Sequence, residues 1–253
     1  MVEKHRSLYD VVKRQLLESQ RPTYLHRLVY IGSHRFVESP TVYEFFESIV
    51  RNVNEKATDA SLSGFLLYYA RLFVHMVEGP EVLILRHLRR VYSCVEAGEE
   101  RLGDMRVLIA CHHIRQPFFT QWMGHTARPP TLLEDIDPLC SEEVTWRHIK
   151  TCLAKMYKLA DHLNYQPAAT LSHALDHLSE TVPTLLPEFG LLKFLQHCKN
   201  LLDLREYLNV YLNGCTRKSY SELVWPIQKG DVPLHLLDPE QYRFLCDMDV
   251  MTT

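Results

Sequence analysis

The amino-acid sequence predicts an α+β fold, in which a ferredoxin-like domain is followed by an α-helical region. Between residues 24 and about 125, stretches rich in β-formers alternate with amphipathic helical stretches in the order β-α-β-β-α-β-β. That order is the split β-α-β pattern of the ferredoxin-like fold with one added strand. After residue 140 the β signal fades, and apolar residues recur at helical spacing.

The first three elements follow from local patterns. "SLYDVVKRQLLES" carries apolar residues at helical period, and Arg21-Pro22 closes that N-terminal helix. "YLHRLVYIG" (24–32) is rich in β-formers and predicts the first strand. "SPTVYEFFESIVRNV" predicts the next helix, with Ser39 as a candidate N-cap and Pro40 at the first helical position.

The remaining elements of the first domain follow in the same way. "SLSGFLLYYARLFVHMVEG" predicts two apolar strands joined in a hairpin around Ala70-Arg71. "PEVLILRHLRRVYSCVEAG" predicts a helix between Pro80 and Gly98, with an apolar stripe of Val82, Leu85, Leu88 and Tyr92. "DMRVLIACHHI" predicts a fourth strand, and "FFTQWM" predicts a short fifth one.

The second half of the chain predicts helices. "HTARPPTLLEDIDP" has the composition of a linker, and three helical stretches follow it: "SEEVTWRHIKTCLAKMYKLADHL", "TLSHALDHLSETV" and "LPEFGLLKFLQHCKNLLDLREYLNVYL". The expected organisation is an N-terminal helix (1–22), the ferredoxin-like domain (23–128), a linker (129–140), a helical extension (141–215) and an irregular tail (216–253).

The sequence contains an apolar sheet face that needs a cover and a tail with apolar residues that could dock onto a surface. One face of the predicted sheet carries Leu25, Val29, Val74 and Met76, and exposing it to water would be unfavourable, so we expect the C-terminal helices to cover it. The tail carries isolated apolar anchors, which suit docking onto a partner or onto the protein's own sheet: Trp225, Leu236, Tyr242 and Phe244.

Composition and charge narrow the class of protein. The chain is 46% hydrophobic and 23% charged with a net charge of −3, which is typical of a globular protein and gives no basic domain for nucleic acid. The N-terminus lacks a secretory signal, and no run of about 18 apolar residues predicts a membrane helix. We therefore expect a cytoplasmic protein, whose seven scattered cysteines are free thiols.

The first domain resembles the BLUF family of flavin-binding blue-light sensors over about 100 residues. The matching pieces are "LHRLVYIG", "SLSGFLLYYARLFVHMVEGPEVLILRHLRRV" and "IRQPFFTQWM", and the strict matches within them are Gly64, Glu78-Gly79 and Trp122. The resemblance implies a flavin beside a hydrogen-bonded tyrosine and glutamine on the central strands, with an asparagine on the first helix of the domain holding the ring.

Carried over residue by residue, the flavin-cleft positions are Tyr30, His75 and Trp122, with His75 in place of the glutamine. An amide presents a donor or an acceptor at one site, whereas neutral imidazole carries them on opposite sides of a rigid ring. The family's asparagine has no counterpart, since Asn54 lies about two positions early. The cleft is therefore predicted to be degenerate, with Tyr30 and Trp122 as core residues and no bound cofactor. His75 is predicted to be buried and hydrogen-bonded to Tyr30.

Other patterns give weak signals for chemistry. His173 and His177 share a helical face, but a zinc-protease motif would need a glutamate after the first histidine. His112 and His113 alternate across a strand, so they are not expected to face one metal ion. The basic stretch "RHLRRV" (86–91) is interpreted as a solvated helix face. No phosphate-binding glycine loop or nucleophile elbow occurs, so no enzyme is predicted.

The leading hypothesis is a non-enzymatic protein-interaction or structural module. The whole chain also resembles a family of mammalian testis-expressed proteins, which implies male germ cells and protein partners among the soluble or axonemal components of the sperm flagellum. The alternative is a sensor or redox protein that retains a divergent cleft and binds FAD.

Overall fold

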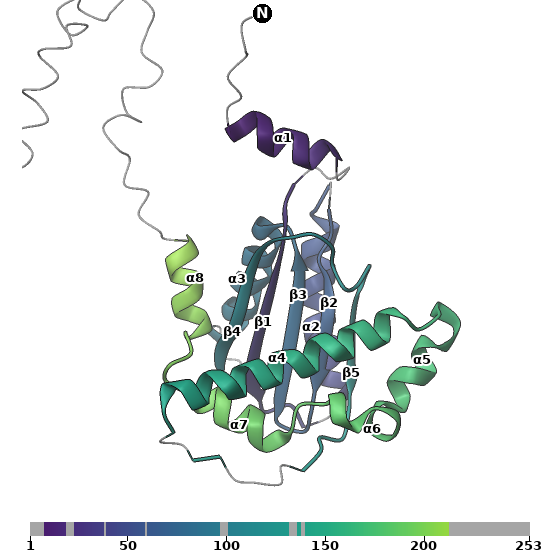
Figure 1. The fold of residues 1–253 in the computed structure, drawn as a ribbon, viewed down its shortest axis with the longest axis vertical. Coiled ribbons are helices and arrows are strands. Elements are labelled where there is room, and N and C mark those ends of the chain that lie inside the picture. Colours follow the sequence, from purple (N-terminus) through teal and green to yellow (C-terminus); the bar gives the residue numbers. More distant parts are fainter. Residues whose placement is uncertain are drawn as a thin grey trace, which may run out of the picture. The chain divides into compact units, whose positions relative to one another are not determined.

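A computed structural model of the chain describes residues 8–18, 23–37, 39–58, 60–96, 101–131, 136–137 and 140–212. Within these residues a five-stranded mixed sheet has the strand order β4-β1-β3-β2-β5 (Figure 1). The strands are β1 (Leu25–His34), β2 (Ser63–Tyr68), β3 (Leu72–Gly79), β4 (Leu102–Ile114) and β5 (Trp122–Thr126). The predicted α+β, ferredoxin-like fold is confirmed.

The pairing of the strands reproduces the split β-α-β pattern. β3 lies between β1 and β2 and is antiparallel to both, while β4 pairs antiparallel with the other edge of β1. β5 adds to the outer edge of β2 in parallel, and it begins at Trp122 rather than at Phe118 as the sequence predicted. The segment before it cannot continue that strand, because the backbone amides of Phe118 and Phe119 donate to the Glu78 carboxylate.

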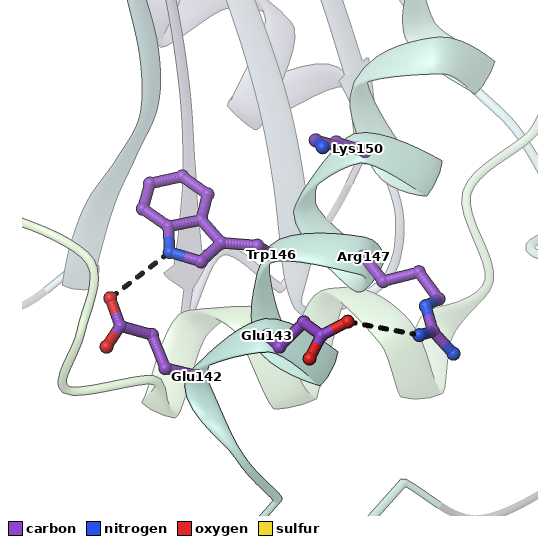
Figure 2. Close-up of a pocket in the computed structure, with 5 residues that line it drawn as sticks. All are labelled: Glu142, Glu143, Trp146, Arg147 and Lys150. Carbon is purple, nitrogen blue, oxygen red and sulfur yellow. Dashed lines mark hydrogen bonds and ion pairs between the residues drawn. The ribbon is translucent and has the colours of Figure 1, made fainter.

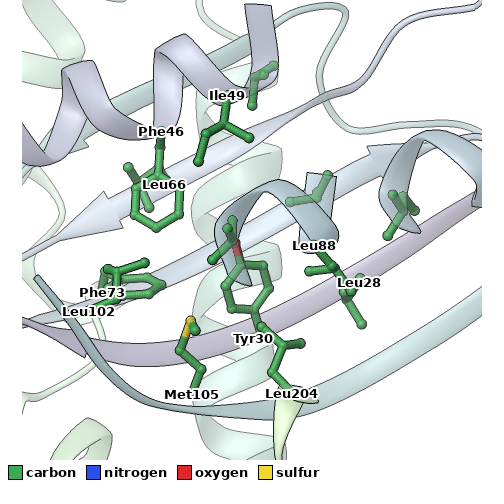
Figure 3. Close-up of a cluster of buried hydrophobic side chains, with 14 of the residues drawn as sticks. Leu28, Tyr30, Phe46, Ile49, Leu66, Phe73, Leu88, Leu102, Met105 and Leu204 are labelled. Atoms are coloured by element: carbon green, nitrogen blue, oxygen red, sulfur yellow. The ribbon is translucent and has the colours of Figure 1, made fainter. Parts of the chain in front are cut away.

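Helices α2 (Ser39–Glu55) and α3 (Glu81–Glu96) cover one face of the sheet. Their apolar residues form one core with Leu28, Tyr30 and Phe73 of the strands (Figure 3). In α3 the buried stripe consists of Leu83, Ile84, Leu88, Val91 and Tyr92. The predicted stripe was wrong at Val82, which is 58% exposed, because the buried face lies one residue further along the helix.

The opposite face of the sheet is covered by the C-terminal helices, as predicted. Figure 1 shows α4 (Glu142–Asn164) crossing this face, and α7 (Phe189–His197) packs beside it. Val29, Val74 and Met76 are fully buried there against apolar residues of α4 and α7 such as Ile149, Met156, Leu192 and Leu195. The sheet is therefore the middle layer of three, and both of its faces are apolar.

The second and third C-terminal stretches form broken helices. "TLSHALDHLSETV" divides into α5 (Ala168–Asp176) and α6 (Leu178–Thr181), and a short 3₁₀ turn (Pro183–Leu185) follows. The last stretch divides into α7 and α8 (Leu204–Leu212). The second break has a clear cause: the Leu202 carbonyl accepts from the Val107 amide and Asp203 bridges to Arg106, so this backbone extends the sheet edge at β4.

The remaining predictions concern the two ends of the chain. The predicted N-terminal helix is present as α1 (Leu8–Glu18). The predicted tail, including Trp225, Leu236, Tyr242 and Phe244, lies outside the described residues, so the expectation about its docking stays a prediction. Among the helices of the described part, none is long and apolar enough to cross a membrane.

Candidate functional site

Tyr30 and His75 lie opposite each other on β1 and β3 in the middle of the sheet. Both side chains are fully buried and point toward α2 and α3. The Tyr30 hydroxyl lies 2.7 Å from His75 Nδ1, within hydrogen-bond distance. The predicted position and partner of His75 are therefore confirmed.

Two further side chains complete a polar cluster around this pair. Trp122, at the start of β5, donates from Nε1 to His75 Nε2 over 2.9 Å. His87, from α3, places its Nε2 3.0 Å from the Tyr30 hydroxyl and is fully buried. All three predicted site residues are thus brought together, and His87 is the member that sequence reasoning missed. We call these four residues the Tyr–His cluster.

The donors and acceptors of the cluster can be assigned from its chemistry. Indole N–H only donates, so His75 Nε2 must accept, and a neutral His75 then carries its proton on Nδ1. That proton is donated to the Tyr30 hydroxyl, whose own proton is left to be donated to His87 Nε2. The chain of donation therefore runs from Trp122 through His75 and Tyr30 to His87.

The chain ends in an unpaired donor. With Nε2 accepting, neutral His87 carries its proton on Nδ1, and this buried atom has no partner among the described residues. Leaving a buried donor unpaired costs about 1–3 kcal/mol. The polar side-chain atoms of Tyr30 and His75 therefore have hydrogen-bond partners, whereas the Nδ1–H of His87, on the side of α3, has none among the described residues.

Burial keeps the cluster uncharged. It lowers the pKa of His75 well below its usual value, and the neighbouring His87 lowers it further. Burial lowers the pKa of His87 to about 3 and raises the pKa of Tyr30 well above its usual value. At neutral pH both imidazoles are thus neutral and the phenol keeps its proton.

The space next to the cluster is filled by side chains from both helices. The Phe46 ring of α2 lies 5.0 Å from the His75 ring between centroids, and the His87 ring of α3 lies 5.1 Å from it. Asn54, the nearest candidate for a ring-holding amide, is engaged elsewhere, because it donates to the Leu62 carbonyl and accepts from the Leu62 amide. A flat ring beside Tyr30 and His75 would have to displace Phe46 or His87.

The motif residues Gly64 and Glu78 have structural roles in this fold. Gly64 has φ +142°, and a Cβ there would lie 2.1 Å from the Met76 carbonyl oxygen. The fully buried Glu78 carboxylate pairs with Arg27 at 2.6 Å and accepts from the amides of Phe118 and Phe119. Gly64 thus allows β2 to lie close to β3, and Glu78 fixes the segment that precedes Trp122.

Three histidines, His26, His112 and His113, lie together at a bulge between β1 and β4, so the alternation expected for His112 and His113 is wrong. The register changes between Leu25 and Arg27, so His26 alone lies opposite both of them. His113 has φ +57°, and both rings lie within about 5 Å of the His26 ring between centroids. The alternation rule failed because the bulge interrupts it. Even so, the described residues hold no group of three or more ligands arranged for a metal ion.

Two cavities of the described part of the chain lie on the surface, and no member of the Tyr–His cluster lines either of them. One cavity, of about 550 Å³, lies at the start of α4. Figure 2 shows its lining, which consists of two acidic residues, two basic residues and Trp146. Trp146 is 48% exposed and donates to Glu142. A second cavity of about 320 Å³ lies between α2 and α3. The polar groups of the Tyr–His cluster therefore lie outside these cavities, while Trp146 and the charged side chains that line the cavities are accessible to a partner.

The strand order, the covering helices and the positions of Tyr30 and Trp122 define a BLUF-like domain, in which His75 stands where the family resemblance places a glutamine. The family model of testis-expressed protein 47 matches residues 24–213, which is more than half of the chain. The chain therefore belongs to the testis-expressed protein 47 family.

Solved structures that match this chain include a light-regulated enzyme, a BLUF domain and the protein BlsA. A bacterial light-regulated adenylyl cyclase is 19% identical over 60% of this chain and 40% of its own, with a TM-score of 0.32. The BLUF domain of BlrP1, a Klebsiella pneumoniae protein, is 17% identical over 40% of this chain and 64% of its own, with a TM-score of 0.30. BlsA in its ground state is 14% identical over 66% and 98%, with a TM-score of 0.29. The chain spans less than two thirds of the first two.

Proposed function

We propose that the chain is a non-enzymatic protein-interaction or structural module built on a degenerate BLUF-like domain. The observation that carries this proposal is the closed Tyr–His cluster. Its polar groups, apart from His87 Nδ1, bond to one another, and Phe46 and His87 occupy the space beside Tyr30 and His75. With the cleft filled by side chains, the binding capacity of the domain lies on its surfaces.

The surface at the start of α4 supports the proposal. Trp is among the residue types most enriched at binding hot spots. Trp146 is about half exposed, and its indole lies beside Glu142 (Figure 2). An exposed indole with charges around it provides an apolar anchor and a polar rim, which is the usual anatomy of a protein interface.

The proposed setting is the cytoplasm of male germ cells and the flagellum of the sperm, with partners among axonemal proteins. Membership of a testis-expressed family supports the tissue. The proposed location in the flagellum goes beyond the family match and is the part of the proposal that the fractionation below tests. A flavin-sensor role has less support, because the cluster leaves the ring no place without a rearrangement of the core.

The proposal is tested by the state of the native protein in germ cells. We expect the protein to remain with the axonemal fraction of sperm when soluble proteins are extracted with mild detergent, and to co-purify with a defined set of proteins after crosslinking. Replacing Trp146 by alanine should weaken that association without loss of the fold, while Leu202→Ala, at another partly exposed apolar residue, serves as the matched control. A freely soluble monomer in native germ-cell extract would contradict the proposal.

A further inference from the structure

The groove between α2 and α3 concentrates positive charge. Its cavity of about 320 Å³ is lined by Lys56, which follows the end of α2, and by Arg86, Arg89 and Arg90 of α3, together with Asn52 and Ser93. The four cationic side chains are exposed, and no carboxylate lines the cavity. Within the described part of the chain, no hydrogen bond or ion pair engages any of these four side chains.

The arrangement is set by helix geometry. Arg86 lies three residues before Arg89 and four before Arg90, so the three guanidinium groups share one face of α3. Like charges at these spacings repel each other and destabilise a helix. The opposite face of α3 is held to the sheet by Leu88 and Val91, which are fully buried, so the charges cannot move apart by shifting the helix. A bound anionic group would relieve this repulsion.

We propose that this groove binds an acidic segment of a protein partner, in which successive carboxylates meet the three arginines and Lys56. The inference rests on the proposed role as an interaction module and names the partner's chemistry at one surface. Guanidinium groups form two parallel hydrogen bonds with a carboxylate, and Asn52 and Ser93 line the same groove as further polar groups.

The geometry favours a peptide over other anions. A nucleic acid requires an extended basic surface, whereas the chain has a net charge of −3 and this groove presents only four cationic side chains. A free phosphate is often held by backbone amides at the N-terminus of a helix. Here α2 contributes its C-terminal end, and the α3 residues lie beyond its first turn. Separate, exposed cations match carboxylates that are spread along a chain.

The test measures binding of a fluorescent poly-glutamate peptide to the full chain by anisotropy, with a poly-glutamine peptide of equal length as the ligand control. We expect binding that weakens as salt rises and that falls at least about tenfold in Arg86→Glu/Arg89→Glu. The matched control is Arg147→Glu/Lys150→Glu, which reverses two exposed cations at the same helical spacing on α4 and should change affinity less than about twofold.

Several outcomes would overturn the inference. One is that the unmodified chain does not bind the poly-glutamate peptide. Another is that both double variants lose affinity equally. A third is that inorganic phosphate displaces the peptide at the same concentration of charged groups. If circular dichroism shows that the charge reversal unfolds the chain, Arg86→Gln/Arg89→Gln takes its place with the same expected direction. The two proposals fail separately. If the chain does not bind the peptide, this inference fails, but the proposed association with the axoneme does not. If the native protein is a soluble monomer in germ cells and still binds the peptide, the proposed function fails, but this inference does not.

Discussion

Replacing Tyr30 by phenylalanine tests the assigned hydrogen-bond chain in the core. The change keeps the ring and its packing and removes only the hydroxyl. Two groups then lose their partners: the Nδ1–H of His75, 2.7 Å away, and the Nε2 of His87, 3.0 Å away. Both imidazoles are fully buried, so water cannot replace the hydroxyl without entering the core.

The expected magnitude follows from the number of stranded groups. Each buried polar group left without a partner costs about 1–3 kcal/mol, so the free energy of unfolding should fall by about 2–6 kcal/mol. The measurement is urea denaturation of the purified chain followed by fluorescence and circular dichroism.

Tyr68→Phe is the matched control. Tyr68 is buried in the same core, but its hydroxyl has no hydrogen bond to the described residues, so the change should cost less than about 0.5 kcal/mol. A Tyr30→Phe variant as stable as this control would show that the cluster is not hydrogen-bonded as assigned.

Three further predictions concern the histidines of the cluster and Gly64 of β2. Burial lowers the pKa of His87 to about 3 and that of His75 well below 6.5, so below pH 6.5 the unfolded chain binds more protons than the folded one. The contribution of these histidines to the free energy of unfolding should therefore be fully present above about pH 6.5 and should be lost as pH falls from there toward about 3. The expected loss is about 1.2 kcal/mol per histidine between about pH 7 and about pH 5.5. Urea midpoints measured across this pH range check the prediction, and a flat profile would contradict it. His75→Gln should leave the fold stable and should not make the protein respond to light, which thermal melts and difference spectra under blue light check. His75→Leu should leave the Trp122 N–H without an acceptor and lower the free energy of unfolding by about 1–3 kcal/mol, which thermal melts also check. Gly64→Ala should lower stability by about 1–3 kcal/mol or more because its φ of +142° is strained for alanine and its Cβ would meet the Met76 carbonyl; an unchanged melting temperature would refute this account.

The sheet and its central pair were predictable from the sequence because each depends on a local or paired pattern. Alternation along "FVHMV" and the β-rich "LVYIG" determine which residues share a face, and the family resemblance places Tyr30 beside His75. The apolar second face, with Val74 and Met76, requires a cover, and apolar residues of α4 and α7, which follow in the chain, supply it. These predictions needed no knowledge of exact distances.

The parts that were missed depend on tertiary contacts. His87 lies inside a basic stretch, and only its position three and four residues after Ile84 and Leu83 signals that it is buried. The bulge that brings His113 toward His26 requires the register of two strands distant in sequence. The start of β5 is delayed because Glu78 binds the backbone of the residues before it. None of these contacts follows from a local period.

The central claim is that the side chains of the Tyr–His cluster, Phe46 and the neighbouring helix residues close the cleft where BLUF proteins hold their flavin. The most direct measurement is the visible absorption spectrum of the purified chain, before and after incubation with excess FAD and removal of the free cofactor. The account predicts a colourless protein in both cases. A stoichiometric flavin spectrum retained by the protein would contradict it.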